Sequence, residues 1–175
     1  MKLHICLGTL TALLCSNALA QTCVTTQPAS IKDGRLIDRK DGTLLDVTTN
    51  LLWSKCNLGE SYNSAKNTCD GTAFKYKSWQ DALNATKDTK LTTIAGQTGF
   101  RLPNIKELRS LAAINCHENA INETVFPNTP SFYLWSSSPA ADDNRSVWII
   151  DFKNGYDNKH RRNYYAPLRL VRSEE

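Results

Sequence analysis

Short runs of apolar residues separated by turn-forming residues open the patterned part of the chain. Residues 35–38 and 43–46 form two such runs, and between them Asp41 is followed by a glycine. An Asp-Gly pair between two runs predicts a β-hairpin, because glycine adopts positive φ angles at little cost. A second turn at residues 48–50 leads into the apolar residues 51–53. The pattern therefore predicts a meander of three short strands.

The middle of the chain carries two signals for short helices. Ser78 can cap a first helix, whose apolar residues recur on one face and which should run to about Thr86. Asn104 can cap a second helix, with Glu107 as its capping-box partner and apolar residues at one-face spacing after it. Residues 57–71 are rich in Asn, Ser and Gly, so we expect a loop there.

The last third of the chain changes to short apolar or aromatic runs at residues 134–137, 147–152 and 168–171, which predict strands. In the second run the larger residues occupy every other position, ending at Phe152. Because alternate residues of a strand share one face, we expect the face with the larger residues to contact the core. The glycine at Gly155, after an asparagine, predicts a turn that sends the chain back.

Strands at both ends and helices in the middle define the fold class as α+β. We expect a single compact domain with two short helices and a mainly antiparallel, twisted sheet. In this sheet the N-terminal and C-terminal strands would meet and bring the chain ends near each other. A chain of 175 residues is long enough to bury a core of its own as one domain.

Residues 1–20 have the composition of a secretory signal peptide. Lys2 precedes an apolar stretch at residues 5–14, and an Ala-Leu-Ala sequence ends the segment as an Ala-x-Ala cleavage site. The apolar stretch is shorter than the roughly 20 residues that a membrane-spanning helix needs, so we expect no membrane span. A lipoprotein alternative would place the lipid on Cys15, although Leu14 stands before it where a small residue is wanted.

The predicted organisation has three parts, which are the signal peptide at 1–20, an N-terminal lead-in at 21–34 and one domain at 35–173. Export leaves the periplasm, the cell surface and the medium open as locations. The formal net charge of +4 stays mildly positive after cleavage, because Lys2 is the only charged residue of the signal peptide. This balance does not imply a nucleic-acid or membrane partner, and we expect neither.

Four cysteines remain beyond the signal peptide, in a chain directed to an oxidising compartment. Two disulfide bonds are the natural expectation. Four cysteines allow three pairings, and closeness along the chain favours Cys56 with Cys69, which leaves Cys23 for Cys116. Zinc is the alternative, but no Cys-x-x-Cys spacing is present, and His117 beside a cysteine is weak evidence. We expect no metal and no cofactor.

Several short phrases occur along the chain in a specific order and spacing. They are Asp41-Gly42-Thr43, Thr49-Asn50-Leu51-Leu52-Trp53, Trp79-Gln80-Asp81-Ala82-Leu83, Arg101-Leu102-Pro103-Asn104-Ile105-Lys106-Glu107-Leu108, Phe126-Pro127, Leu134-Trp135-Ser136-Ser137-Ser138-Pro139, Val147-Trp148, Asp151-Phe152, Asn154-Gly155 and Leu168-Arg169-Leu170-Val171-Arg172. Together they resemble the Lcl C-terminal domain family, named for the end domain of the Legionella collagen-like adhesin. The resemblance spans about residues 36–172.

The resemblance implies a fold related to C-type lectin domains and to the formylglycine-generating enzymes, in bacterial secreted or surface proteins. In the namesake adhesin the domain is associated with trimer formation and with binding of sulfated glycosaminoglycans. This sequence carries no collagen-like repeats. It has Asn50 where the family usually has glycine, and asparagine tolerates the left-handed backbone conformation. The Glu-Pro-Asn and Trp-Asn-Asp motifs of calcium-dependent sugar binding are absent.

The run Lys159-His160-Arg161-Arg162 is the one local concentration of charge, and we expect it on a loop. Guanidinium groups offer paired donors to sulfate or carboxylate oxygens, and Tyr164 could stack on a sugar ring beside them. The alternative is a solvated basic loop without a ligand. The sequence therefore offers these five residues as a candidate site for an anion or a glycan.

Other candidate sites favour structural interpretations. Residues 142–144 could bind Ca²⁺, but three consecutive residues cannot all reach one ion, so a solvated turn is favoured. Arg101 and Trp135 could line a pocket, but pairing with a carboxylate and packing in the core are favoured. Residues 136–138 lack the Gly-x-Ser-x-Gly elbow of serine hydrolases, and we expect no enzyme.

Three functional hypotheses remain in order of preference. The first is an exported, non-enzymatic binding module with an adhesive role, which recognises a sulfated or acidic polysaccharide or a surface partner. The second is a structural accessory subunit of a pilus or envelope assembly, which would meet an envelope protein through an exposed apolar patch. The third is an enzyme of the formylglycine-generating fold, which would need a free, exposed cysteine.

Overall fold

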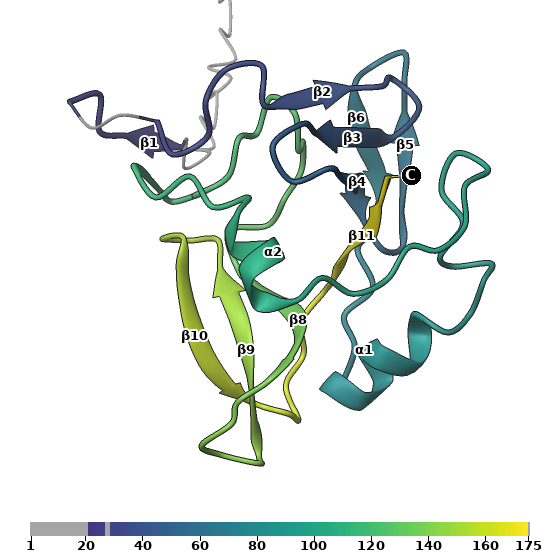
Figure 1. Cartoon of the computed structure of the whole chain (residues 1–175), viewed down its shortest axis with the longest axis vertical. Coiled ribbons are helices and arrows are strands. Elements are labelled where there is room, and N and C mark those ends of the chain that lie inside the picture. The colour runs from purple at the N-terminus through teal and green to yellow at the C-terminus, as the bar shows by residue number, and fades with distance from the viewer. Residues whose placement is uncertain (1–20, 27–28, 175) are drawn as a thin grey trace, which may run out of the picture.

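The computed structural model describes residues 21–26 and 29–174 (Figure 1). The signal peptide predicted for residues 1–20 lies outside the described residues. Two larger antiparallel sheets, two short two-stranded ribbons and two short helices make up the described secondary structure. The predicted α+β domain with mainly antiparallel pairing and two short helices is confirmed at this level. Within the described chain, no helix has the length and apolar character needed to cross a membrane.

The first sheet joins strands from both ends of the chain. β2 (Leu36–Asp38) and β3 (Thr43–Asp46) form the predicted hairpin, and β3 pairs in turn with β4 (Leu51–Asn57). β11 (Arg169–Ser173) pairs with the other side of β4, which gives the strand order β11-β4-β3-β2. The predicted meander and the pairing of N-terminal with C-terminal strands are therefore confirmed.

The second sheet consists of β8 (Tyr133–Pro139), β9 (Ser146–Asp151) and β10 (Tyr156–Arg161) in the order β10-β9-β8. The strands thus divide between two larger sheets rather than one, because these three pair among themselves. β10 contains most of the basic run, which was expected on a loop. That expectation is wrong, because the turn at Gly155 returns the chain along β9 as an edge strand.

The segment expected as a loop at residues 57–71 is also ordered as strands. β5 (Glu60–Asn63) and β6 (Thr68–Gly71) form an antiparallel hairpin. A disulfide between Cys56 and Cys69 attaches β6 to the end of β4. The polar composition hid the hairpin, because a ribbon that lies mostly on the surface needs no apolar alternation.

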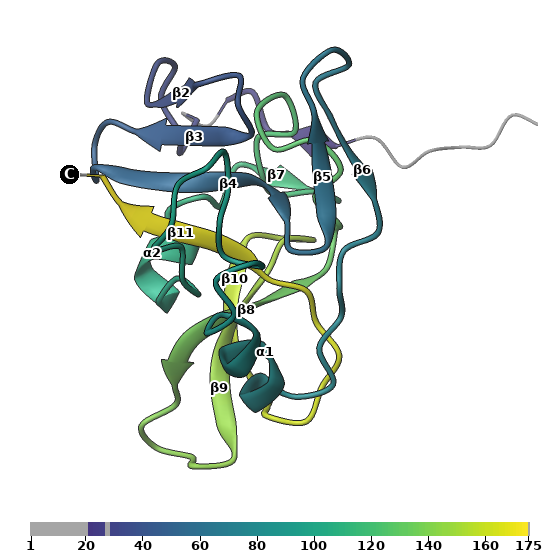
Figure 2. The same ribbon diagram turned by 90° about the vertical axis from the view of Figure 1, so that its right-hand side faces the viewer.

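The lead-in is fastened in a similar way. β1 (Thr22–Cys23) pairs with β7 (Cys116–His117), and the Cys23–Cys116 disulfide joins the two strands. Both disulfides match the favoured pairing, in which closeness along the chain selects Cys56 with Cys69 and leaves Cys23 for Cys116. β1 and the end of β11 lie on different sides of the domain in both ribbon views (Figures 1 and 2). The expectation that the chain ends meet is therefore wrong, because β7 holds the lead-in away from β11.

Both predicted helices form where their capping residues place them. α1 (Trp79–Ala85) begins after Ser78, whose side chain accepts a hydrogen bond from the backbone of Asp81. α2 (Ile105–Arg109) begins after Asn104 with the complete capping box predicted from Glu107. Each cap satisfies backbone N–H groups that have no partner inside a helix, so these short helices begin at defined residues.

The core consists of two clusters, and β9 contributes to both. Ile150, with Phe152 just after the strand, packs in a cluster with α2 and Trp53. Val147 and Ile149 pack in the other cluster, with Trp79 and Trp135. The expectation that only the face with the larger residues contacts the core is therefore wrong. A strand covered on both faces is buried at consecutive positions, which removes the contrast between its two faces.

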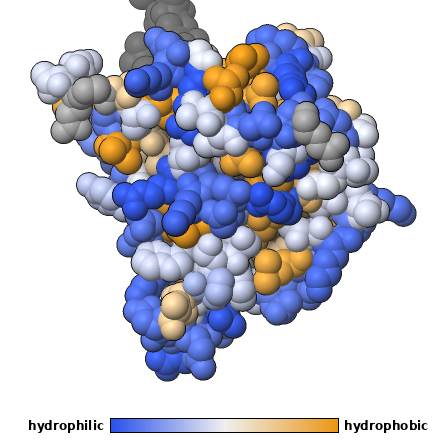
Figure 3. Space-filling model, viewed as in Figure 1, coloured by the Kyte–Doolittle hydropathy of each residue, from blue (hydrophilic) through white to orange (hydrophobic). Residues whose placement is uncertain are grey.

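The outer surface carries little continuous apolar area on the side drawn in Figure 3. There the apolar residues form separate small groups among hydrophilic ones (Figure 3). Apolar side chains scattered in this way are ordinary for a folded domain. Recognition on this protein therefore has to be sought in particular clusters of side chains.

Candidate functional site

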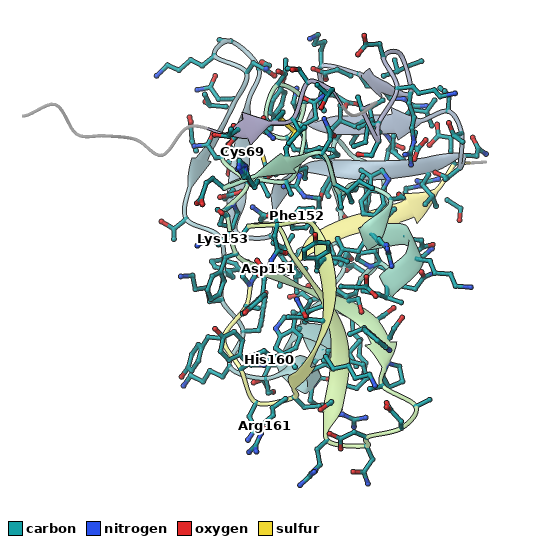
Figure 4. All side chains as sticks on the ribbon, turned by 90° about the vertical axis from the view of Figure 1, so that its left-hand side faces the viewer. Cys69, Asp151, Phe152, Lys153, His160 and Arg161 are labelled. Atoms are coloured by element: carbon teal, nitrogen blue, oxygen red, sulfur yellow. A yellow bond between two sulfur atoms is a disulfide. The ribbon has the colours of Figure 1, made fainter. Side chains whose placement is uncertain are left out.

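The basic run lies on β10 and on the residues that follow it. Successive side chains of a strand point to opposite faces, so Lys159 and Arg161 belong to one face and His160 to the other. Figure 4 shows His160 and Arg161 at the end of the domain that lies away from Cys69 of β6. The run is therefore divided between two faces of one edge strand and does not form a single cationic loop.

Lys159 has a carboxylate partner. Its Nζ forms an ion pair with Asp142 and lies 5.2 Å from the centre of the Trp148 ring, on the residue opposite it in β9. The hydrogen bond from Lys159 holds the pKa of Asp142 below its ordinary value. Lys159 thus brings less net positive charge to the surface than the sequence predicts, because the neighbouring carboxylate offsets it.

The acidic residues 142–144 form a turn with internal partners. The Asp143 carboxylate accepts hydrogen bonds from the backbone N–H of Arg145 and from the hydroxyl of Ser146. These hydrogen bonds lower the pKa of Asp143 to about 2. Since one carboxylate closes the turn and the other pairs with Lys159, the segment has the role of a structured surface turn.

His160 belongs to an aromatic cluster that the sequence does not reveal. Its ring centre lies 3.9 Å from that of Tyr164 and 5.5 Å from that of Tyr133. Phe132 extends the cluster, with ring centres 4.9 Å from Tyr133 and 6.1 Å from Tyr164. The side chain of Phe132 is 37% exposed, so the edge of the cluster reaches the solvent. We call these four residues the aromatic cluster.

Arg162 occupies the most unusual position in the basic run. Its guanidinium carbon lies 4.9 Å from the centre of the Trp79 ring, in the geometry of a cation–π contact. Its backbone is fixed as well, because its N–H donates to Arg145 and its carbonyl accepts from the N–H of Trp79. The Nε of Arg162 is buried without a hydrogen-bond partner. Within the described residues, the guanidinium has neither an ion pair nor a hydrogen bond.

Trp79 is itself held rigidly by the second sheet. Its indole N–H donates to the carbonyl of Ser136 in β8 at 2.8 Å, and its side chain is only 9% exposed. Arg161, next to Arg162, is exposed and takes part in no ion pair within the described chain. Arg161 and Arg162 are thus consecutive residues without anionic partners in the described chain, and the aromatic cluster contributes His160 and Tyr164 on either side of them in the sequence.

The sequence reveals only part of this arrangement. His160, Arg161, Arg162 and Tyr164 stand close together in the chain, so their grouping could be predicted. Trp79 and the pair Phe132 and Tyr133 come from distant segments and carry no motif that points to β10. Arg101 follows the predicted structural role, because its guanidinium pairs with the Glu107 carboxylate at 2.8 Å.

One geometric cluster of metal-ligand types lies near β5, formed by Cys56, Glu60 and Cys69. The two sulfur atoms of this cluster are bonded to each other in a disulfide. A disulfide sulfur lacks the thiolate charge that zinc requires of a cysteine ligand. This cluster is therefore accounted for by covalent cross-linking.

The fold and the surface define the class of protein as a small, disulfide-braced α+β domain with two mainly antiparallel sheets. The family model of the Lcl C-terminal domain matches residues 42–172, and the chain belongs to this family. This match confirms the resemblance found in the sequence phrases. No curated protein matches the chain closely enough to count as a relative.

Proposed function

We propose that this protein is an exported, non-enzymatic binding module that recognises an anionic polysaccharide. The contact would be made by Arg161, Arg162, Trp79 and the aromatic cluster, which we call the surface around β10. The observation that carries the proposal is the half-buried guanidinium of Arg162, which is held on Trp79 and lacks an anionic partner in the described chain. Arg161, the preceding residue in the chain, supplies a second exposed cation, and the aromatic cluster supplies flat apolar surface. Sulfate or carboxylate groups on a sugar chain complement this combination.

The position of Arg162 favours binding because the side chain is already ordered. A flexible arginine loses rotamer freedom when it binds, whereas contact with the Trp79 ring removes part of that freedom in advance. A planar guanidinium presents paired N–H donors that match the oxygens of sulfate and carboxylate. Solvent weakens each such contact at the surface and association costs free energy, so the arginines need the additional contact with the sugar rings for measurable affinity.

The aromatic cluster would contact the sugar rings themselves. A pyranose ring has an apolar C–H face, and placing it on an aromatic ring removes apolar surface from water. The Tyr164 ring already lies against that of His160, with their centres 3.9 Å apart and their planes tilted, so its position at the edge of the surface is restricted. The cluster and the arginines together distinguish a charged polysaccharide from a simple inorganic anion.

The covalent structure supports export and a non-enzymatic role. Two disulfides suit an oxidising compartment such as the periplasm, the cell surface or the medium. Each of the four cysteines in the described chain takes part in a disulfide, so the free thiol that the enzyme hypothesis requires is not among them. We also propose that the fold belongs with the C-type-lectin-like and formylglycine-generating-enzyme-like domains, as the family resemblance implies.

Chromatography of the mature protein on heparin, beside a cation exchanger of matched charge density, tests the proposal. We expect heparin to retain the protein to higher salt than the exchanger does. The double substitution Arg161→Ser and Arg162→Ser should weaken heparin affinity by about tenfold or more, because two charge-assisted contacts are lost.

The matched control changes the exposed Lys32 and Lys66 to serine, which removes the same formal charge from the lead-in and from the β5–β6 hairpin. This control should retain most of the wild-type affinity for heparin. Equal retention on both resins, or an equal loss in both double variants, would contradict recognition by the surface around β10.

A second candidate is a structural subunit that meets an envelope protein. Tyr156 and Tyr165, near the aromatic cluster in the chain, are 63% and 55% exposed, which is unusual for large side chains without a partner. This function predicts capture of an envelope protein that persists at high salt and is lost when both tyrosines become serine. Persistence of capture in that variant would exclude this surface as the contact.

A further inference from the structure

A pocket of about 460 Å³ lies on other elements than the surface around β10. The beginning of the β5–β6 hairpin forms one side of it, and the loop at residues 90–95 forms the opposite side. Figure 2 shows this loop passing across β4 and β11, on the side of the domain that faces the viewer. The volume falls within the range of about 300–1,000 Å³ that is usual for pockets that bind small molecules.

Two aromatic side chains line this pocket, and each lies against a glycine. A Cβ on Gly59 would approach the Phe74 ring to 2.7 Å, and a Cβ on Gly42 would approach the Cβ of Tyr62 to 3.1 Å. Both glycines have positive φ angles, so other residues would be strained there even without these contacts. The missing side chains therefore leave room for both aromatic residues at the wall of the pocket.

Core packing does not explain the position of Phe74. This residue is 48% exposed and belongs to neither of the two core clusters. Its backbone N–H donates to the carbonyl of Leu58 at 2.8 Å, which fixes the place where the ring leaves the chain. An ordered and half-exposed aromatic ring beside a pocket suits contact with the apolar face of a ligand.

The polar groups of the pocket are mainly acceptors. Glu60 uses Oε2 to accept hydrogen bonds from the backbone N–H and the side-chain amide of Asn57, and its other oxygen, Oε1, accepts no hydrogen bond within the described chain. Asp41 uses Oδ1 for the backbone N–H and hydroxyl of Thr43, and its other oxygen is likewise uncommitted there. Lys90 is the one cationic residue among those that line the pocket.

The charges of this pocket disfavour an anionic ligand, whereas those of the surface around β10 favour one. The buried Arg169 acts electrostatically on Glu60 from behind the wall, but the charged groups that line the pocket are two carboxylates and one ammonium group. An anion placed against the carboxylate oxygens is therefore disfavoured, because like charges repel in a partly desolvated site. Uncommitted carboxylate oxygens favour a ligand with several O–H or N–H donors. A ligand that offers both an apolar ring face and many such donors is a sugar.

We propose that this pocket binds one uncharged sugar unit, which packs on Phe74 and donates hydrogen bonds to Glu60 and Asp41. The site goes beyond the proposed recognition of anionic chains and uses none of the same residues. A protein with both sites would hold an anionic segment of a glycan at β10 and an uncharged unit beside β5.

Titrations of the mature protein with N-acetylglucosamine, glucose and glucuronate, followed by NMR chemical-shift changes of the pocket residues, test the proposal. We expect millimolar dissociation constants for the two uncharged sugars. Glucuronate should bind about tenfold more weakly or worse, since its carboxylate meets Glu60 and Asp41. Phe74→Ala should weaken binding of the uncharged sugars by about tenfold, because the ring contact is lost.

Two further variants keep the test specific. Glu60→Gln preserves the size of the side chain and removes its charge, so the preference for glucose over glucuronate should narrow to about threefold or less. Ile114→Ala removes an exposed apolar side chain that belongs to neither site, and it should leave binding in the pocket unchanged.

Three results would each overturn the proposal. They are the absence of shift changes with either uncharged sugar up to about 50 mM, equal binding by Phe74→Ala and the wild type, and binding of glucuronate as strong as that of glucose. Heparin retention does not depend on these outcomes. The pocket and the surface around β10 can therefore fail or succeed separately.

Discussion

Two arginines near the C-terminus occupy similar sites but differ in the acceptors that their guanidinium groups reach. Arg169 and Arg162 both lie over an aromatic ring, that of Phe126 at 4.5 Å and that of Trp79 at 4.9 Å, and both have a buried Nε without a partner. Neither has a carboxylate in direct contact within the described chain. The comparison shows how one residue type can donate to several backbone and side-chain oxygens in one region of the described chain and have no acceptor in another.

Arg169 is committed to the backbone of the first sheet. It is fully buried and donates to the carbonyls of Ser54 and Lys55, to the side-chain oxygen of Asn57 and to the hydroxyl of Thr129. The pairing of β11 with β4 shifts register next to Arg169, and the guanidinium supplies donors to carbonyls at that irregularity. Burial lowers the pKa of Arg169 to about 9, and the charge of Glu60 opposes this shift.

Arg162 has the same chemical capacity but no acceptors among its described neighbours. The difference lies in the surroundings, because β4 presents carbonyl oxygens to Arg169 whereas Trp79 presents only the face of a ring to Arg162. A half-buried donor without an acceptor is rare in folded proteins and calls for an explanation. We attribute the open donors of Arg162 to recognition of an anionic ligand, and the following variants separate this role from a structural one.

The largest effect is expected from Arg169→Met, which removes the guanidinium and retains an apolar stem. Four acceptors lose their donor, and several of them are buried, so the free energy of unfolding should fall by about 3–5 kcal/mol. Urea denaturation followed by circular dichroism measures this change. A loss below about 1 kcal/mol would show that Arg169 does not stabilise the irregular pairing of β11 with β4.

The next largest effect concerns an arginine that does have a carboxylate partner. Arg35 donates to both oxygens of Asp46, with Nε 3.0 Å from Oδ1, and Asp46 is fully buried. Asp46→Asn should lower the free energy of unfolding at pH 7 by about 2–4 kcal/mol, since a buried pair is broken. Urea denaturation of both proteins at pH 7 gives the difference.

The same pair predicts a pH dependence with a defined sign. Burial acts to raise the pKa of Asp46, but hydrogen bonds from Arg35, Thr49 and Thr48 outweigh it, and the pKa lies below its ordinary value. The stabilisation is therefore present above an unfolded pKa of about 3.9 and is lost as pH falls through the lower folded value. Asp46→Asn should lack this acid-dependent loss, and an unchanged acid profile would contradict the assignment.

A smaller effect on stability and a distinct effect on binding are expected from Arg162→Met. The free energy of unfolding should change by less than about 1 kcal/mol, because no hydrogen bond of the described chain is lost. Affinity for a heparin-derived octasaccharide should fall about tenfold in calorimetric titration. Strong destabilisation without a change in affinity would assign Arg162 the same kind of role as Arg169.

The smallest effect on octasaccharide affinity is expected from Trp79→Phe. This change removes the indole hydrogen bond to Ser136, worth about 1 kcal/mol, and weakens the cation–π contact with Arg162. Octasaccharide affinity should fall by about two- to threefold, since Arg162 stays in place but is less ordered. Calorimetric titration of both variants with the octasaccharide ranks their losses of affinity. A loss for Trp79→Phe as large as that for Arg162→Met would contradict this prediction.

These comparisons also show which parts of the structure the sequence can predict. The caps at Ser78 and Asn104 depend on residues three positions apart, and the hairpin at Asp41 depends on an adjacent glycine, so local chemistry suffices for them. β10 was missed for a physical reason. As an edge strand with mostly polar side chains it lacks the apolar alternation that marks a half-buried strand.

The candidate site, too, could be predicted from the sequence only in part. Arg161, Arg162 and Tyr164 could be found as a charged run with a neighbouring aromatic residue. Their division between two faces depends on the strand, and the role of Trp79 depends on the packing of α1 against the second sheet, which no local pattern encodes. The distinction between Arg162 and Arg169 required knowledge of which carbonyl oxygens each guanidinium reaches.

The most direct measurement observes both arginines in one sample. ¹H–¹⁵N NMR spectra of the arginine Nε groups can be recorded while a heparin-derived octasaccharide is added to the mature protein. We predict that the Nε–H signal of Arg162 shifts with saturation while that of Arg169 stays in place. Binding of the octasaccharide with an unmoved Arg162 signal would contradict the claim that this arginine is kept for an anionic ligand.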